Sequence, residues 1–155
     1  MLRSNLIILC LFFILFNAKA ADLTPEAKKA KNLVESALSY YKKYGKEKTF
    51  AEINNTKGKF VDEEYYIFVL DMDGVCLARG DGNAKRIGKN LIEEQDPNGK
   101  FYIKEMIKIL KTTGWGWVDY KRTNPTVKKI ENKSSYVKKV EGENFFFGCG
   151  FYKGN

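Results

Sequence analysis

The sequence predicts an α+β domain in which a long N-terminal helix packs against an antiparallel sheet of about five strands. Residues 114–153 contain three runs of β-forming residues, separated by turns at Pro125 and Gly142. Residues 65–78 contain two more such runs. Helical periodicity precedes each group of strands, so the predicted order is helix, hairpin, helix and three-stranded meander. The 155 residues suffice for one domain and contain no internal repeat.

The first helix is predicted to begin at Thr24-Pro25-Glu26, with the threonine as N-cap and the proline at the first helical position. Gly45 is expected to end it, a shorter helix to cover residues 48–54, and a loop to cover residues 55–62. The apolar stripe of the long helix is narrow and rich in alanine, which favours packing flat across a sheet or against another helix. Its members are Ala27, Ala30, Val34, Ala37, Leu38 and Tyr41.

The middle of the chain is predicted to form a hairpin, a polar loop and a second helix. Strands are expected at residues 65–70 and 75–78, joined by a tight turn at residues 71–74, and the loop at residues 79–90. Asp96-Pro97 is expected to open the helix, which continues through Thr112 and stops at Gly114. The inward face of this helix is expected to carry Ile103, Met106, Ile107 and Leu110.

The last strand, FFFGCGFY at residues 145–152, is apolar on both faces and is therefore expected at the centre of the sheet. Alternation places Gly148 and Gly150 on one face, where a helix or a ligand could approach the backbone closely. The opposite face carries three phenylalanines and Cys149.

Residues 1–20 are typical of a secretory signal peptide. Arg3 precedes an apolar stretch from Leu6 to Phe16, and the small-x-small triplet at residues 18–20 suits cleavage after Ala20. The apolar stretch is shorter than the ~20 residues that a membrane-spanning helix requires. We therefore expect residues 21–155 to form one exported, periplasmic domain that does not span the membrane after cleavage.

The net charge of the mature chain is moderate and its basic residues are scattered. Removing Arg3 and Lys19 from the 27 basic residues leaves 25 against 19 acidic ones, a net charge of +6. The lysines are interspersed with acidic residues and form no dense run or aromatic-interleaved stripe. This pattern favours an ordinary solvated surface over a nucleic-acid interface.

The residue types exclude several kinds of catalytic and metal site. The chain has no histidine, so Ser-His and Cys-His catalytic pairs and His-ligated zinc sites are impossible. The mature chain keeps Cys76 and Cys149, which are too distant in sequence for a Cys-x-x-Cys motif. Glycine spacing matches no dinucleotide or phosphate loop. We predict no cofactor and no metal site.

Residues 67–75, IFVLDMDGV, resemble the first motif of haloacid dehalogenase-like phosphatases. The resemblance implies Asp71 as nucleophile and Asp73 as acid/base beside a magnesium ion. No later apolar strand ends in the acidic pair that this family also uses, and no strand–helix alternation indicates a parallel sheet. Asp-x-Asp-Gly also suits a hairpin turn, which is the preferred interpretation. The phosphatase is kept as an alternative.

A second resemblance covers about 90 residues and is more specific. The stretches YYIFVLDMDGVCLARG, IGKNLIEEQDPNGKFYIKEMI and GWGWVDYKRTNPTVKKIENKSSYVKKVEGENFFFGCGFY carry seven short motifs in one order. They include Gly-Lys-Asn-Leu, Gly-Trp-Val-x-Tyr and Gly-x-Gly-x-Tyr. Together they resemble a single Cache domain of the second type, an extracellular sensor family of bacteria with a PAS-like fold. Where many members have a histidine soon after the second strand, this chain has Arg79.

The Cache resemblance implies a small-molecule pocket, often for small organic acids, on the sheet face opposite the long helix. Carboxylate recognition needs a cation and hydroxyl donors in a partly desolvated pocket. Arg79 and Lys133 are the candidate anchors, Tyr120 and Tyr136 the candidate donors, and Trp117 the candidate apolar wall. For each of these residues singly, core packing or surface exposure remains an alternative to ligand binding.

The same resemblance implies that the strands carrying Cys76 and Cys149 flank the strand at residues 65–70 from opposite sides. Their Cα atoms would lie roughly 9–10 Å apart, too far for a disulfide, so both are expected to be free buried thiols.

The sequence carries neither an output domain nor a second apolar segment, so we expect any signal to pass through a separate receptor or envelope protein. A non-enzymatic ligand-binding protein is the preferred function. An envelope interaction module whose pocket is filled by side chains remains a second alternative, beside the phosphatase.

Overall fold

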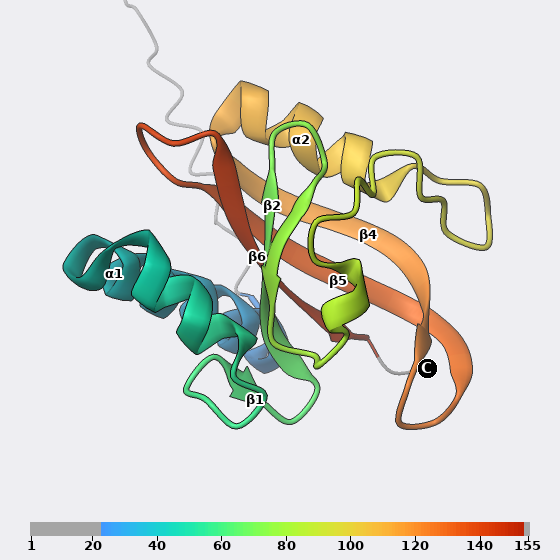
Figure 1. Ribbon diagram of the computed structural model, residues 1–155. Coiled ribbons are helices and arrows are strands. Elements are labelled where there is room, and N and C mark those ends of the chain that lie inside the picture. Colours follow the sequence, from blue (N-terminus) through green and yellow to red (C-terminus); the bar gives the residue numbers. More distant parts are fainter. Residues whose placement is uncertain (1–22, 154–155) are drawn as a thin grey trace, which may run out of the picture.

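The computed structural model describes residues 23–153, and the predicted signal peptide at residues 1–20 lies outside this range. The elements follow the predicted order, with a central antiparallel sheet between two helices (Figure 1). The helices are α1 (Pro25–Asn54), the 3-10 turn η1 (Ala84–Arg86) and α2 (Tyr102–Thr113). The strands are β1 (Val61–Asp62), β2 (Tyr65–Asp71), β3 (Cys76–Arg79), β4 (Trp115–Asn124), β5 (Lys129–Lys139) and β6 (Phe145–Tyr152).

The sheet confirms the predicted α+β class and the central position of the last strand. The strand order is β1-β2-β6-β5-β4. Strand β3 pairs with β2, on the edge of β2 that faces away from β6. Every pairing is antiparallel. Because β6 lies between β2 and β5 and is buried along its whole length, both of its apolar faces are covered. The short strand β1 occupies the end of a segment that the sequence predicts to be a loop.

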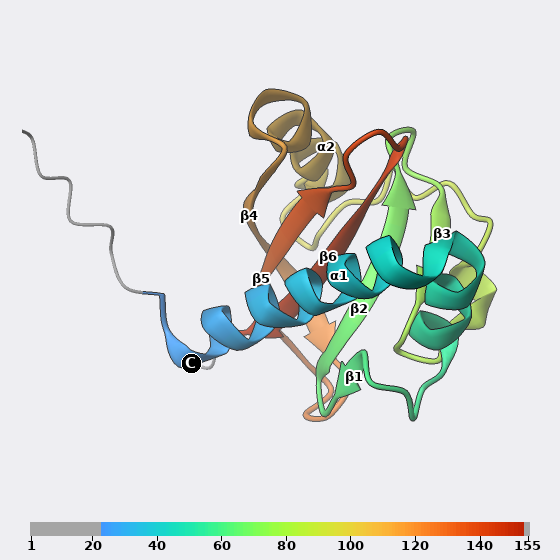
Figure 2. The same cartoon turned by 90° about the vertical axis from the view of Figure 1, so that its left-hand side faces the viewer.

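The long helix α1 covers one face of the sheet, and its course bends at Gly45 (Figure 2). Gly45 has φ 76° and ψ 178°, which are not helical angles, so two helical segments meet there. The predicted end at Gly45 and the shorter helix after it are therefore both present. Thr24 accepts a hydrogen bond from the backbone N–H of Ala27 at 3.3 Å, as an N-cap does.

Two apolar clusters occupy the two faces of the sheet. The first joins the alanine-rich stripe of α1 to Ile67, Val69 and the odd-numbered residues of β6. The second joins the predicted inward face of α2 to Leu70, Val118 and Phe146. The alternation predicted for β6 therefore decides which side chains meet α1 and which meet α2.

The start of α2 differs from the prediction. Asp96-Pro97 does not open the helix, which begins at Tyr102. The Asp96 carboxylate instead accepts the backbone N–H groups of Asn98 at 2.8 Å and Lys100 at 3.0 Å, and on its other oxygen that of Lys121 at 2.9 Å. It thus closes a turn and ties that turn to β4, a contact that the local sequence does not reveal. None of the helices within residues 23–153 combines the length and apolar character that a membrane crossing requires.

Candidate functional site

A small cavity, here called the inner chamber, lies between the α2-facing side of the sheet and α2. Its volume is about 40 Å³. Apolar side chains from β2 and α2 line it together with basic and tyrosine side chains. The lining residues are Tyr66, Phe68, Leu70, Cys76, Arg79, Arg86, Leu91, Tyr102, Ile103, Met106, Tyr120, Arg122, Lys133 and Gly150.

Lys133 is the most deeply buried cation of the inner chamber, with only 2 % of its surface exposed. Its side chain runs over Gly150, where an added Cβ would lie 2.6 Å from the lysine Cε, so only glycine leaves room for it. The Nζ atom lies 4.2 Å from the ring centre of Tyr152 and 5.1 Å from that of Tyr66. Burial and the nearby Arg122 guanidinium lower the pKa of Lys133 to about 8.

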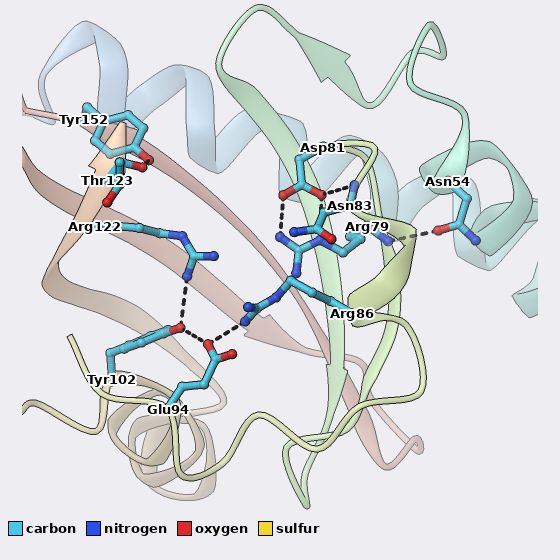
Figure 3. Close-up of polar contacts among 10 residues, drawn as sticks. All are labelled: Asn54, Arg79, Asp81, Asn83, Arg86, Glu94, Tyr102, Arg122, Thr123 and Tyr152. Atoms are coloured by element: carbon cyan, nitrogen blue, oxygen red, sulfur yellow. Dashed lines mark hydrogen bonds and ion pairs between the residues drawn. The ribbon is translucent and has the colours of Figure 1, made fainter. Parts of the chain in front are cut away.

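Arg79 is buried and paired with a carboxylate. Its guanidinium donates to both carboxylate oxygens of Asp81, with the Nε to Oδ1 bond at 2.6 Å. Burial would lower the pKa of Arg79, but the bond to Asp81 outweighs it and raises that pKa. The backbone N–H of Arg79 donates to Asn54 Oδ1 at 2.9 Å, which fixes the end of β3 to the end of α1 (Figure 3).

Four polar side chains form a connected chain, and three of them, Arg86, Tyr102 and Arg122, line the chamber (Figure 3). Arg86 Nη2 donates to Glu94 Oε2 at 2.5 Å, and the Tyr102 hydroxyl donates to the same oxygen at 2.5 Å. Arg122 Nη1 in turn donates to the Tyr102 hydroxyl at 3.0 Å. Burial opposes ionisation of Glu94, but the bonds from Arg86 and Tyr102 outweigh it and lower the pKa of this carboxyl. The chain links β4, α2 and the loop after β3.

Tyr120 is held rigidly against α2. Its ring stacks on that of Tyr102 with 4.4 Å between centroids and 7° between planes. Its hydroxyl lies 2.9 Å from Ser135 Oγ, so a buried polar atom has a partner. Burial raises the pKa of Tyr120, which keeps the hydroxyl protonated and able to donate.

An open groove, here called the outer groove, borders the inner chamber on the side of the β4–β5 hairpin. Its volume is about 850 Å³. Tyr66, Arg122 and Lys133 line both spaces, so these three side chains form the boundary between them. A molecule in the outer groove would meet this boundary before entering the chamber.

The structure brings three of the five predicted site residues together and separates the other two. Arg79, Tyr120 and Lys133 line the inner chamber. Trp117 and Tyr136 lie on the opposite face, where their ring centroids are 5.1 Å apart and both belong to the cluster under α1. The five residues therefore do not form one site.

The physical reason is strand alternation. Tyr136 is three residues after Lys133, and Trp117 three before Tyr120, so each pair must point to opposite faces of the sheet. The Tyr136 hydroxyl donates to Glu35 of α1 at 3.4 Å.

Sequence reasoning missed several residues of the chamber. Arg122 lies two residues after Tyr120 on the same face of β4, so alternation could have identified it. Tyr66 and Phe68 could have been found in the same way from β2. Arg86 comes from a loop. It is linked to Tyr102 of α2 through Glu94, which both residues contact, and no local sequence pattern predicts this link.

The Asp71 carboxylate supports a turn. One of its oxygens accepts the backbone N–H groups of Asp73 at 3.0 Å and Val75 at 2.8 Å, between β2 and β3. The described part of the chain holds no parallel strand pair and no group of three or more His, Cys, Asp or Glu residues that could hold a metal ion. Nothing in this geometry supports the phosphatase alternative. Cys76 and Cys149 are both free and buried, and their strands flank β2.

The model of the family described as Single Cache domain 2 matches residues 17–155 of this chain. Among the solved structures that share the fold, three illustrate the likeness. A Cache chemosensory domain described for carboxylic acid recognition is 23 % identical, with a TM-score of 0.70 over 83 % of this chain and 93 % of that one.

The other two structures are chemotaxis proteins. A methyl-accepting chemotaxis protein from Vibrio parahaemolyticus RIMD 2210633 is 19 % identical, with a TM-score of 0.67 over 81 % of this chain and 86 % of that one. A periplasmic sensor domain of a chemotaxis protein is 22 % identical, with a TM-score of 0.63 over 82 % and 90 %.

Proposed function

We propose that this chain, which belongs to the Single Cache domain 2 family, is a periplasmic sensory protein that binds a small organic acid. Cache domains of this kind are typically ligand-binding modules without catalytic activity. The proposal adds three things to family membership: export through the N-terminal segment, the chemical class of the ligand, and a separate receptor or envelope protein that receives the signal.

The observation that carries the proposal is the buried lysine at the boundary of the two spaces. Lys133 is 2 % exposed, and no carboxylate among residues 23–153 forms an ion pair with it. A buried unpaired ammonium group is costly, which the lowered pKa of Lys133 reflects. A carboxylate ligand would restore a partner to this cation, and Tyr66, which lines both spaces, offers a hydroxyl donor for the same ligand.

The proposal is tested by a thermal-shift panel on the purified protein with small carboxylates, amino acids, amines and purines. A ligand at 100 times its dissociation constant adds about 2.7 kcal/mol to the free energy of unfolding, which raises the melting temperature by several degrees. We expect a shift with at least one small carboxylate, its loss in Lys133→Met and its retention in Lys138→Met.

Lys138 is a matched control because it lies on the same strand and pairs with Glu35 on the other face. A shift with amines or purines alone would contradict the proposed ligand class. A silent panel, repeated after unfolding and refolding to remove any copurified ligand, would instead favour an envelope interaction module without a ligand.

A further inference from the structure

The side chains that line the inner chamber carry more positive charge than the neighbouring carboxylates neutralise. Of the four cations that line it, Arg79 pairs with Asp81 and Arg86 pairs with Glu94. The other two have no carboxylate partner among residues 23–153, which leaves a net charge of +2 around a space of about 40 Å³. The four cations are Arg79, Arg86, Arg122 and Lys133.

The donors available to an anionic ligand lie on two different walls. Arg122 and Lys133 belong to the sheet wall, on β4 and β5. Arg86 belongs to the loop wall, on η1, and its Nε atom is buried and has no hydrogen-bond partner in the described chain. Figure 3 shows Arg122 bonded to Tyr102 and Arg86 bonded to Glu94, at the two ends of the Tyr102–Glu94 pair.

A buried guanidinium N–H without an acceptor is expensive, so the Arg86 Nε marks a place where an acceptor is missing. One carboxylate at Lys133 and Arg122 would leave this donor unsatisfied and one positive charge uncompensated. A second acidic group on the same ligand would correct both. Cationic groups on two different walls suit two separate carboxylates better than one compact ion such as hydrogenphosphate.

We propose that the ligand is a short dicarboxylate, with one carboxylate at Arg122 and Lys133 and the other at Arg86. The inference rests on the proposed function and narrows the class of organic acid. The small volume of the chamber limits the ligand to a few carbon atoms between the two groups. The open outer groove gives such a ligand a path to the chamber.

Isothermal titration with two matched pairs of acids tests the inference. Malonate and propionate differ only in a carboxylate replacing a methyl group, as do succinate and butyrate. We expect the better dicarboxylate to bind at least about tenfold more tightly than its monocarboxylate, which corresponds to about 1.4 kcal/mol.

Equal or tighter binding of the monocarboxylates would overturn this inference while the proposed function stands. Binding of hydrogenphosphate more tightly than either dicarboxylate would overturn it too. If no acid binds, the proposed function fails as well.

Variants locate the second anchor. Arg86→Gln should abolish the dicarboxylate preference, whereas Lys85→Gln, which removes the exposed neighbouring cation, should leave that preference unchanged. The single variant also frees the carboxylate of Glu94, which could repel any anion. The double variant Arg86→Gln/Glu94→Gln removes one positive and one negative charge, so it keeps the net charge and removes the Arg86 guanidinium without leaving an unpaired carboxylate. Loss of the preference in the double variant supports the inference, and its retention overturns it.

Discussion

Replacing Lys133 with methionine is expected to stabilise the ligand-free protein at neutral pH. Burial and Arg122 lower the pKa of Lys133 to about 8, against 10.5 for a solvated lysine. Between these values the unfolded chain binds a proton that the folded chain does not, so the free energy of unfolding rises with pH in this window. Below about pH 8 the buried charge costs the folded state about 3 kcal/mol. Methionine fills a similar volume and removes that cost.

The loss of favourable contacts reduces the expected gain. The ammonium group lies over the rings of Tyr66 and Tyr152, and such contacts contribute about 1 kcal/mol. We therefore expect Lys133→Met to gain about 2 kcal/mol at pH 7, or about 4–8 °C in melting temperature. The gain should shrink as the pH rises from 8 towards 10.5, because wild-type Lys133 then becomes neutral.

Urea unfolding of both proteins at pH 6.5, 8 and 9.5, in buffers without small carboxylates, measures this difference. Lys138→Met serves as the control, because Lys138 is half-buried in a surface ion pair with Glu35 and contributes at most about 1 kcal/mol. A destabilised Lys133→Met protein, or a gain that does not change with pH, would refute the view of Lys133 as a buried unpaired cation.

Three further outcomes are expected. Gly150→Ala should weaken carboxylate binding and cost about 1–3 kcal/mol in unfolding free energy, since its methyl group would lie 2.6 Å from the buried lysine; calorimetry and urea unfolding check both. Tyr102→Phe removes the hydroxyl that accepts from Arg122, so stability should fall by about 1–3 kcal/mol in urea unfolding, and an unchanged value would contradict the polar chain. Cys76 and Cys149 should resist alkylation in the native protein and both react after unfolding without reductant, which peptide mass spectrometry can follow; a pair that stays unlabelled would reveal a disulfide.

The cysteine expectation has a second physical basis. Burial raises the pKa of Cys149 to about 12, so almost no reactive thiolate exists at neutral pH in the folded protein. Burial also raises the pKa of Cys76, against a smaller opposing effect of Arg79. Both thiols should therefore be protected by the fold rather than by a bond between them.

The sequence by itself determined the order of the main elements and the class of the fold. Local signals were sufficient for the N-cap at Thr24, the bend at Gly45 and the turn at Asp71, because each depends on residues close in the chain. Alternation in β6 also determined which face meets each helix, because a strand's side chains must point to opposite sides. The same rule, applied to β4 and β5, would have kept Trp117 and Tyr136 out of the site.

Only the tertiary structure decided which cations share the inner chamber. Arg86, Arg122 and Lys133 come from a loop and two strands, and they meet because α2 and the loop close over one face of the sheet. The late start of α2 has the same kind of cause, since the Asp96 carboxylate binds the backbone of β4, distant in sequence. Charge balance in a cavity depends on which distant groups are buried together, and no local pattern in the chain carries that information.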